Sequence, residues 1–338
     1  MQASKYLFVW LLPLSVVFSF HSEGIGTYAA LIFGFVIVPF ADFFLGEDRS
    51  APDESFRHKR VFDVILWLTV PTQLGILIWF LTIASHERNF SEAMGIITSM
   101  GLMCGVFGIN VAHELGHRTS RAEQFLAQLM LTTSLYPHFF IEHNKGHHKN
   151  VATMEDPASA RMGESVYAFW LRSIMGSWLS AWNISAKESA RKGLRIWSWK
   201  NPMVVYALLI IGIPVTIGIL LGMQTCLYFL AAALIGILLL ETVNYIEHYG
   251  LSRKKVNEFR YQDVEPIHSW NADFRLGRIV LFDLTRHSDH HYEPSKPYQV
   301  LTSMNASSQL PAGYPAMMLL SLIPPLWYRV MHPLIQRN

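Results

Sequence analysis

Histidines are the side chains in this sequence whose spacing could do chemistry. The chain has 15 histidines, and most of them fall in four short motifs, HELGH, EHNKGHH, NYIEHYGL and RHSDHH. The nine in these motifs are His113, His117, His143, His147, His148, His248, His287, His290 and His291. Residues i, i+3 and i+4 share one face of a helix, so a motif with several histidines could aim all its ring nitrogens at one point. This pattern predicts a metal site.

The number of imidazoles indicates more than one ion. A catalytic zinc site uses about three protein ligands, so nine ligands divide naturally between two ions, with positions left open for oxygen. Imidazole binds iron, copper, nickel and zinc alike, and ligand type alone therefore does not decide the metal. The need for a second redox-capable ion favours iron.

Polar side chains flank the motifs. Histidines that bind metal usually donate their second ring N–H to such groups. The flanking residues are Glu114, Glu142, Asn144, Asn244, Glu247 and Asp289. Glu241 lies inside an apolar segment, where an acid is typically functional. His138 and His268 lie beside the motifs. We expect all of these to surround the ligands, although ordinary helix-end or hydrogen-bonding roles are the alternative.

The elements that must position the histidines are membrane helices. The chain is 51% hydrophobic and 15% charged, whereas a soluble domain is about 25% charged. Stretches near the roughly 20 apolar residues that a span needs occur at residues 6–20, 25–45, 61–84, 93–112, 203–222 and 225–243. The first could instead be a signal-peptide core, but the HSEGIG that follows it lacks a cleavage pattern. The sequence predicts an all-α integral membrane protein with six transmembrane helices.

The positive charges predict the topology. With a cytoplasmic N-terminus and six crossings, 26 of the 27 Lys and Arg residues lie on the cytoplasmic side, and only Arg88 lies outside. Cytoplasmic loops carry such an excess. Both termini and all four histidine motifs are then cytoplasmic, and His113 and His248 lie at the same membrane boundary.

We expect a single membrane enzyme domain over residues 1–338. Its parts would be helices one to four (1–112), a cytoplasmic histidine-rich segment (113–200), helices five and six (201–246), and a second cytoplasmic histidine-rich segment with a C-terminal membrane-surface helix (247–338). The only cysteines, Cys104 and Cys226, are isolated. An iron–sulfur electron carrier must therefore be a separate protein.

Read in order, HELGHR, HFFIEHNKGHHKNVATMEDPASARMGES, NYIEHYGL, HSWN and RHSDHH resemble the membrane-bound alkane 1-monooxygenases. That family belongs to the histidine-rich diiron hydroxylases and fatty-acid desaturases. The resemblance implies a cytoplasmic diiron cap held by the nine histidines, which hydroxylates the terminal methyl of n-alkanes with O2 to give 1-alkanols. It also implies two non-haem iron ions, electrons from rubredoxin and an NADH-dependent rubredoxin reductase, and the bacterial inner membrane, with no nucleic acid involved.

A terminal C–H bond offers no charge and no acidic proton, so the cofactor must carry the chemistry. The protein would place the alkane, which could enter from the lipid bilayer between helices. Channel-lining candidates in the second span are Phe33, Gly34, Phe35 and Phe40, although packing or lipid contact is the alternative for each. The basic segments 187–200 and 253–255 could dock an acidic rubredoxin, or could reflect only the positive-inside bias.

Three other functions are compatible with parts of the pattern. HELGH matches the HExxH motif of zinc proteases, with Glu114 as general base, but that function leaves the other motifs unexplained. A diiron enzyme could act on an aromatic methyl, a terpene or an acyl chain. A metal transporter would place its ligands in mid-membrane rather than at the edge.

Overall fold

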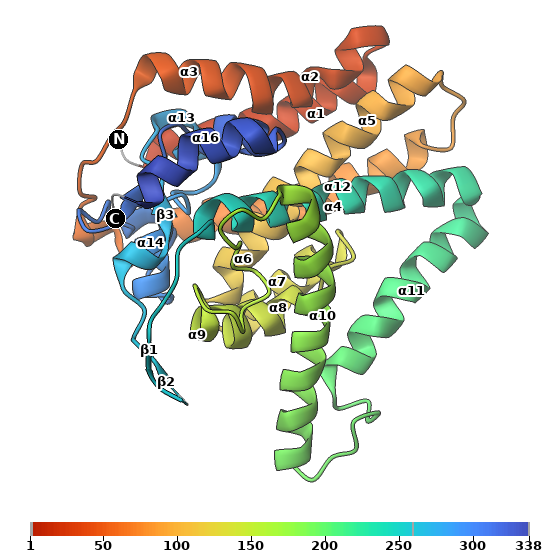
Figure 1. The fold of residues 1–338 in the computed structure, drawn as a ribbon. Helices are drawn as coiled ribbons and strands as arrows, with labels where there is room; N and C mark the ends of the chain where they lie inside the picture. The colour runs from red at the N-terminus through yellow and green to blue at the C-terminus, as the bar shows by residue number, and fades with distance from the viewer. Residues whose placement is uncertain (1–2, 259, 337–338) are drawn as a thin grey trace. The chain divides into compact units, whose positions relative to one another are not determined.

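The computed structural model describes residues 3–258 and 260–336 and is mostly helical (Figure 1). It divides into two compact units. Unit 1 comprises Met1–Ile37, Arg60–Ile141 and Ala181–Leu240, and unit 2 comprises Val38–Lys59, Glu142–Ser180 and Glu241–Asn338.

Within the described residues, six helices are long and apolar enough to cross a membrane. They are Ala3–His21, Gly24–Leu45, Arg60–Ile83, Phe90–Gly116, Pro202–Leu221 and Met223–His248. The predicted all-α fold with six spans is confirmed. The fourth and sixth helices continue past their predicted ends at residues 112 and 243, so His113 and His248 belong to the last turns of the helices themselves.

Several spans change helix type along their length. The first joins η1 (Ala3–Trp10) to α1 (Leu11–His21), and the second runs through η2 (Gly24–Tyr28), α2 (Ala29–Ile32), η3 (Phe33–Ile37) and α3 (Val38–Leu45). The third is α4 (Arg60–Ile83), and the fourth runs through α5 (Phe90–Met103), η5 (Cys104–Asn110) and α6 (Val111–Gly116). The fifth is α11 (Pro202–Leu221) and the sixth is α12 (Met223–His248). Segments η3 and η5 are π-helical.

Local sequence signals set the ends of α11. The Asn201 side chain accepts a hydrogen bond from the Met203 amide at 3.0 Å, which satisfies one of the orphan donors at the helix start. Pro202 occupies the first turn, where its missing N–H costs nothing. Gly222 ends the helix with φ of 91°, a conformation that glycine adopts without strain.

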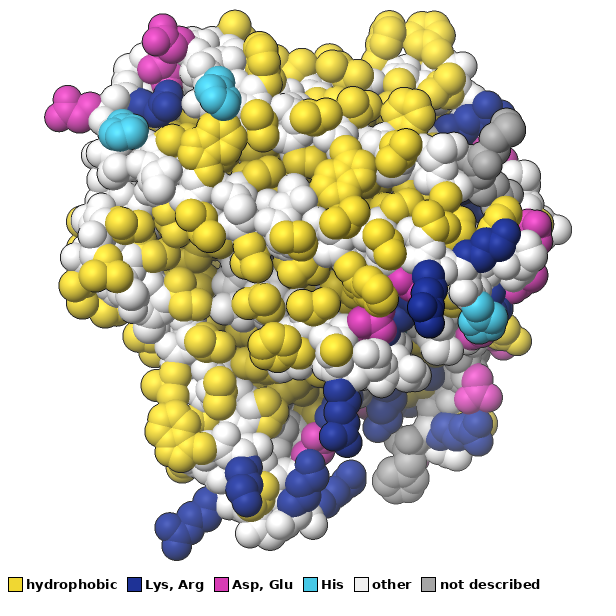
Figure 2. Space-filling model, turned by 180° about the vertical axis from the view of Figure 1, so that it is seen from behind, with side chains coloured by type: hydrophobic (Ala, Val, Ile, Leu, Met, Phe, Trp, Pro, Cys, Tyr) yellow, Lys and Arg dark blue, Asp and Glu magenta, His cyan; other side chains and the backbone are white. Residues whose placement is uncertain are grey.

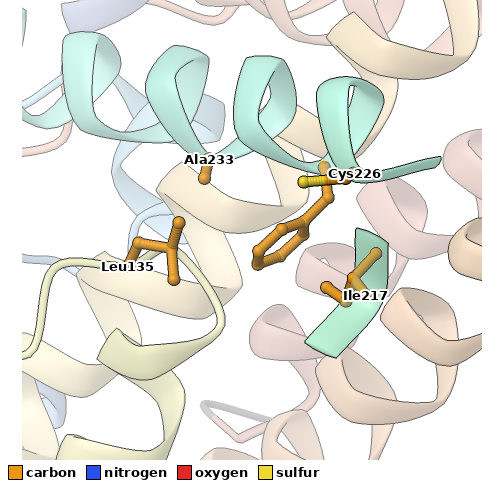
Figure 3. Packing of buried hydrophobic residues seen from close by; sticks show 5 residues of the cluster. Leu135, Ile217, Cys226 and Ala233 are labelled. Atoms are coloured by element: carbon orange, nitrogen blue, oxygen red, sulfur yellow. The ribbon is translucent and has the colours of Figure 1, made fainter. Parts of the chain in front are cut away.

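An apolar cluster joins α11 to α12 within unit 1. Leu135, Ile217, Cys226, Phe229 and Ala233 are buried against one another (Figure 3). The Cys226 thiol of α12 also donates to the Pro214 carbonyl of α11 at 3.3 Å, so a buried polar contact adds to the apolar packing of the two helices. Cys226 is a free, buried thiol.

The outward faces of the spans are apolar. On α11, Ile211, Ile219 and Leu220 are 66%, 77% and 73% exposed. Hydrophobic side chains cover much of the face shown in Figure 2. An apolar surface of this extent is unstable in water but suits contact with lipid tails, so the chain is a multi-pass membrane protein.

The remaining elements lie outside the six spans, and α10, with 26 residues, is the longest of them. Between the fourth and fifth spans lie α7 (Arg121–Thr132), α8 (Phe139–Glu142), η6 (His143–His147), α9 (His148–Asn150) and α10 (Val166–Arg191). Elsewhere lie η4 (Glu54–Phe56), η7 (Pro266–His268), α13 (Arg275–Val280), α14 (His287–Tyr292), η8 (Tyr298–Val300), α15 (Tyr314–Ser321) and α16 (Pro324–Ile335). Strands β1 (Lys255–Asn257) and β2 (Arg260–Tyr261) are antiparallel, and β3 (Trp270–Asn271) and β4 (Ser308–Gln309) are parallel.

A buried carboxylate ties α3 to α13 within unit 2. Asp42 Oδ1 accepts hydrogen bonds from the amides of Leu276 and Gly277 at 2.7 and 3.1 Å. These amides start a helix and have no partner within it. A Cβ at Gly277 would lie 2.6 Å from Asp42 Oδ2, so the close approach requires glycine there.

Replacing Asp42 with alanine should therefore destabilise unit 2. The variant leaves the two amides unsatisfied and should lose about 1–2 kcal/mol of unfolding free energy. Thermal unfolding in detergent measures the change. Asp53→Ala is the control, because Asp53 caps only the short exposed η4 through Ser55. Equal melting temperatures for the two variants would contradict the role of Asp42.

Candidate metal centre

Four buried histidines of unit 2 turn their nitrogens toward one another. They are His147, His248, His287 and His291, and their candidate ligand atoms all lie within 4.8 Å of one another. His147 Nε2 is 3.2 Å from His291 Nε2, and His248 Nε2 is 3.1 Å from His287 Nε2. His291 Nε2 is 2.9 Å from His287 Nε2. Segments η6, α12 and α14 supply these rings, so three separate parts of the chain converge here.

This donor set fits a metal ion. Metal–imidazole bonds are about 2.0–2.1 Å long, so neighbouring nitrogens on one ion lie about 3 Å apart, as they do here. A neutral imidazole has one N–H and one lone pair. Each inward nitrogen offers either one N–H or one lone pair, so hydrogen bonds can satisfy at most two of these three close contacts, whereas an ion can accept a lone pair from all four nitrogens.

A second group of histidines also lies in unit 2. His143, His148 and His290 offer ligand atoms within 4.8 Å of one another, and His148 Nε2 is 3.0 Å from His143 Nε2. His113 and His117 belong to unit 1, where their ring centroids are 5.1 Å apart at the end of α6. Unit 2 by itself thus gathers seven of the nine predicted ligands into a group of four and a group of three.

The π-helical turn η6 explains how these groups form. Its hydrogen bonds run from i to i+5, and the His148 amide bonds to the His143 carbonyl. His143 and His148 therefore lie one above the other, while His147 joins the group of four. We expected His143 and His147 to aim at one point, as an i, i+4 pair on an α-helix would. That expectation is wrong, because a π-helical turn contains one more residue than an α-helical turn, and residues four apart in it no longer point the same way.

The motif on α14 divides in the same way. His287 and His291, four residues apart, belong to the group of four, whereas His290 belongs to the group of three. The expectation that all three aim at one point is therefore also wrong. The motif on η6 and α9 and the motif on α14 each supply histidines to the group of four and to the group of three. The two groups are therefore held in a fixed relation to each other within unit 2.

Arg286 fixes the start of α14. Its buried guanidinium donates to Asp273 Oδ1 at 2.9 Å and to the Leu301 carbonyl at 2.6 Å. It also donates to the carbonyls of Asp48 and Ser50 at 2.9 and 3.0 Å. Because its planar guanidinium donates four hydrogen bonds, Arg286 is held rigidly directly before His287.

Asp156 contacts the ring nitrogen of His147 that faces away from the group of four. Asp156 Oδ2 lies 2.9 Å from His147 Nδ1 and also accepts from the Ser159 hydroxyl at 2.6 Å. Burial alone would raise the pKa of Asp156, but His147 and these hydrogen bonds lower it, so the group is a carboxylate. An Nδ1–H held in this way leaves Nε2 free to bind metal. Asp156 is not among the site residues predicted from the sequence. The only signal was its place in the ATMEDPASA stretch, nine residues after His147.

Other predicted neighbours contact the site in different ways. His268 offers its backbone carbonyl, 3.4 Å from His248 Nδ1, while its ring nitrogens face Gln262 and Glu265. Asp289 accepts from Lys296 Nζ at 2.7 Å and from the Thr302 amide at 2.6 Å.

The acids near α12 are all buried. Glu241 Oε2 accepts from Asn244 Nδ2 at 3.3 Å. Burial, together with the charges of Asp156 and Glu241, raises the pKa of Glu142. Glu247 contacts the Tyr314 hydroxyl with one oxygen and approaches His287 with the other.

Two predicted neighbours lie in unit 1, and one lies in η6. Glu114 pairs with Arg118 at 2.9 Å. Burial lowers the pKa of His138 to about 3, so its ring is neutral. Asn144 is half-buried within η6 of unit 2.

The channel candidates have different surroundings. Phe33 is buried and Phe35 is half-buried in η3, whereas Phe40 on α3 is 65% exposed. A Cβ added at Gly34 would lie 2.9 Å from Leu102 Cδ2. Bulk at Gly34 must therefore displace the Leu102 side chain.

Six spans and buried clusters of imidazole define a multi-pass membrane protein with a histidine metal centre. Residues 91–321 match the family described as fatty acid desaturase. The chain is 38% identical to alkane 1-monooxygenase 1 of Pseudomonas aeruginosa, over 98% of this chain and 91% of that protein. It is 34% identical to alkane 1-monooxygenase of Ectopseudomonas oleovorans, over 97% and 85%. It is also 28% identical to the xylene/toluene monooxygenase hydroxylase component XylM of Pseudomonas putida, over 79% and 72%.

The chain therefore belongs to the alkane 1-monooxygenase family, within the fatty acid desaturase family of membrane enzymes. The resemblance noted from the motifs is confirmed.

Asp156→Asn should weaken metal binding. An amide cannot hold Nδ1–H of His147 as a carboxylate does, and losses of such partners cost about 10–100-fold in metal affinity. Dialysis against a graded chelator, followed by metal analysis, measures the effect. Asp263→Asn is the matched control, because its side chain is 84% exposed. Unchanged affinity in Asp156→Asn would contradict the assigned role.

Proposed function

We propose that this chain is an alkane 1-monooxygenase, which hydroxylates the terminal methyl of n-alkanes to 1-alkanols with O2 and electrons from reduced rubredoxin. The observation that carries the proposal is the convergence of four buried imidazoles in unit 2. The names of relatives that align with nearly the whole chain support the substrate.

The proposed ligands are the nine histidines of the four motifs. His147, His248, His287 and His291 would hold one iron ion. His113 and His117 would join the group of three as ligands of the second, because an i, i+4 pair at the end of a span can aim both nitrogens at one ion. The two units would then act as a single enzyme domain over residues 1–338, with the C-terminal helices on the membrane surface.

When bound, the two irons would supply the oxygen activation that an inert C–H bond requires. The chain's own residues position the parts. Asp156 holds the tautomer of His147, and Arg286 holds α14. Apolar side chains between the spans would bind the alkane and exclude water, and Phe33, Gly34, Phe35 and Phe40 are the proposed lining.

We place the protein in the bacterial inner membrane with both termini in the cytoplasm, because 26 of 27 basic residues then lie inside. A separate rubredoxin, reduced by an NADH-dependent reductase, would dock on basic surface residues. The exposed Lys254 and Lys255, at the start of β1, are candidates, as is the 187–200 segment.

A second candidate substrate is an aromatic methyl group. The 28% identity to the xylene/toluene monooxygenase component supports it. Both reactions would use the same metal centre, so the choice depends on the shape of the apolar channel.

Iron-loaded protein should convert n-alkanes to 1-alkanols. The assay combines the full chain in detergent with rubredoxin, its reductase, NADH, O2, a mixture of n-alkanes, and toluene, and products are identified by gas chromatography. His291→Ala should be inactive, since it removes a ligand from the group of four. Benzyl alcohol without 1-alkanols would favour the second substrate, and no alcohol with one zinc per chain would overturn both.

Gly34→Trp should shift the products toward shorter alkanols. The indole must displace Leu102 and would shorten a channel that passes Gly34. The chain-length distribution from the mixed-alkane assay measures this shift. Val36→Trp is the control, because Val36 is 58% exposed on the same helix. An unchanged distribution for Gly34→Trp would remove Gly34 from the channel.

A further inference from the structure

We propose that Glu247 is a carboxylate ligand of the ion at the group of four histidines, oriented for that role by Tyr314. This inference rests on the proposed metal centre. It adds an oxygen donor to a site for which the sequence indicated only nitrogen donors, and it moves Glu247 from the surroundings of the ligands to the metal itself.

The position of one carboxylate oxygen carries the argument. Glu247 Oε2 lies 3.2 Å from His287 Nε2. That same nitrogen is 3.1 Å from His248 Nε2 and 2.9 Å from His291 Nε2. Glu247 Oε2 therefore approaches His287 at the nitrogen that faces the other three histidines.

Asp156 provides the contrast within the same site. Its Oδ2 lies 2.9 Å from Nδ1 of His147, while Nε2 of that ring faces His291. Asp156 thus contacts the outer nitrogen, as expected for a group that orients a ligand. Glu247 contacts an inner nitrogen, so when His287 binds metal through Nε2, the Glu247 oxygen faces the ion instead of an N–H.

Tyr314 fixes the direction of the carboxylate. Its hydroxyl donates to Glu247 Oε1 at 2.9 Å, and both side chains are almost fully buried. Glu247 lies in the last turn of α12, and Tyr314 begins α15. The phenol holds one oxygen, and the other approaches His287 Nε2 at 3.2 Å.

Charge gives a reason for a carboxylate here. Nine neutral imidazoles bring no negative charge, whereas two divalent ions bring four positive charges into a buried site. Unpaired buried charge is costly, and compensation is strongest at the shortest distance. Carboxylate oxygen together with imidazole nitrogen is a donor set that suits non-haem iron.

Anaerobic binding of 57Fe(II) to the full-length protein in detergent tests the proposal. In Glu247→Gln we expect the affinity for one of the two ions to fall at least about tenfold, the lower end of the range for a lost supporting carboxylate. The Mössbauer quadrupole splitting of that ion should change as well. Glu247→Asp should show the same spectral change, since its oxygen is one methylene short of the ion although the charge is kept.

Two further variants keep the test decisive. Tyr314→Phe releases Oε1 and should broaden or shift the signal of the same iron, and it remains informative if the Glu247 variants fail to fold. Glu155→Gln removes one negative charge from an exposed position of unit 2 and should match wild type. Wild-type affinity and spectrum in both Glu247 variants, or in Tyr314→Phe should those not fold, would overturn the proposal.

The outcome is separable from that of the proposed function. The binding assay contains neither O2 nor alkane, so a protein that binds iron through Glu247 but forms no 1-alkanol would retain this inference and lose the substrate. A wild-type protein that binds no iron would overturn both.

Discussion

Convergence of imidazole rings at a buried point is the constraint on which the rest of the structure depends. Of the three contacts that bring Nε2 atoms to 2.9–3.2 Å, hydrogen bonds between the rings can satisfy only two, because each Nε2 carries either one N–H or one lone pair. The arrangement is therefore stable only if the surrounding protein enforces it or an ion occupies it. Three features of the protein enforce it. The π-helical turn η6 directs His143 and His147 to different groups, Asp156 binds Nδ1 of His147, and the Arg286 guanidinium anchors the start of α14.

The composition of the site also limits its chemistry. Imidazole nitrogens from three elements meet at one group, and only a few carboxylates approach it closely. Asp156 acts on the outer side of a ring, whereas Glu247 approaches an inner nitrogen. Two acids of similar burial thus contact different nitrogens of inward-turned rings, Asp156 the Nδ1 of His147 and Glu247 the Nε2 of His287.

The sequence was sufficient to predict the spans and the dense histidine motifs, because hydropathy and local spacing are properties of contiguous residues. It was not sufficient to predict how the histidines of each motif divide between the group of four and the group of three. His143 pairs with His148 rather than with His147 because of one π-turn, which no residue type announces. Asp156 was missed for a related reason, since its contact with His147 depends on the loop that folds back after α9.

Helix α12 links the metal centre to the lipid around it. At about 1.5 Å per residue, the 26 residues from Met223 to His248 form a rod of about 39 Å, longer than the roughly 30 Å hydrocarbon core of a bilayer. The excess must be taken up by tilt or by protrusion. Because His248 ends this unbroken rod, the thickness of the bilayer bears directly on the angle at which its imidazole meets the other three rings of the group.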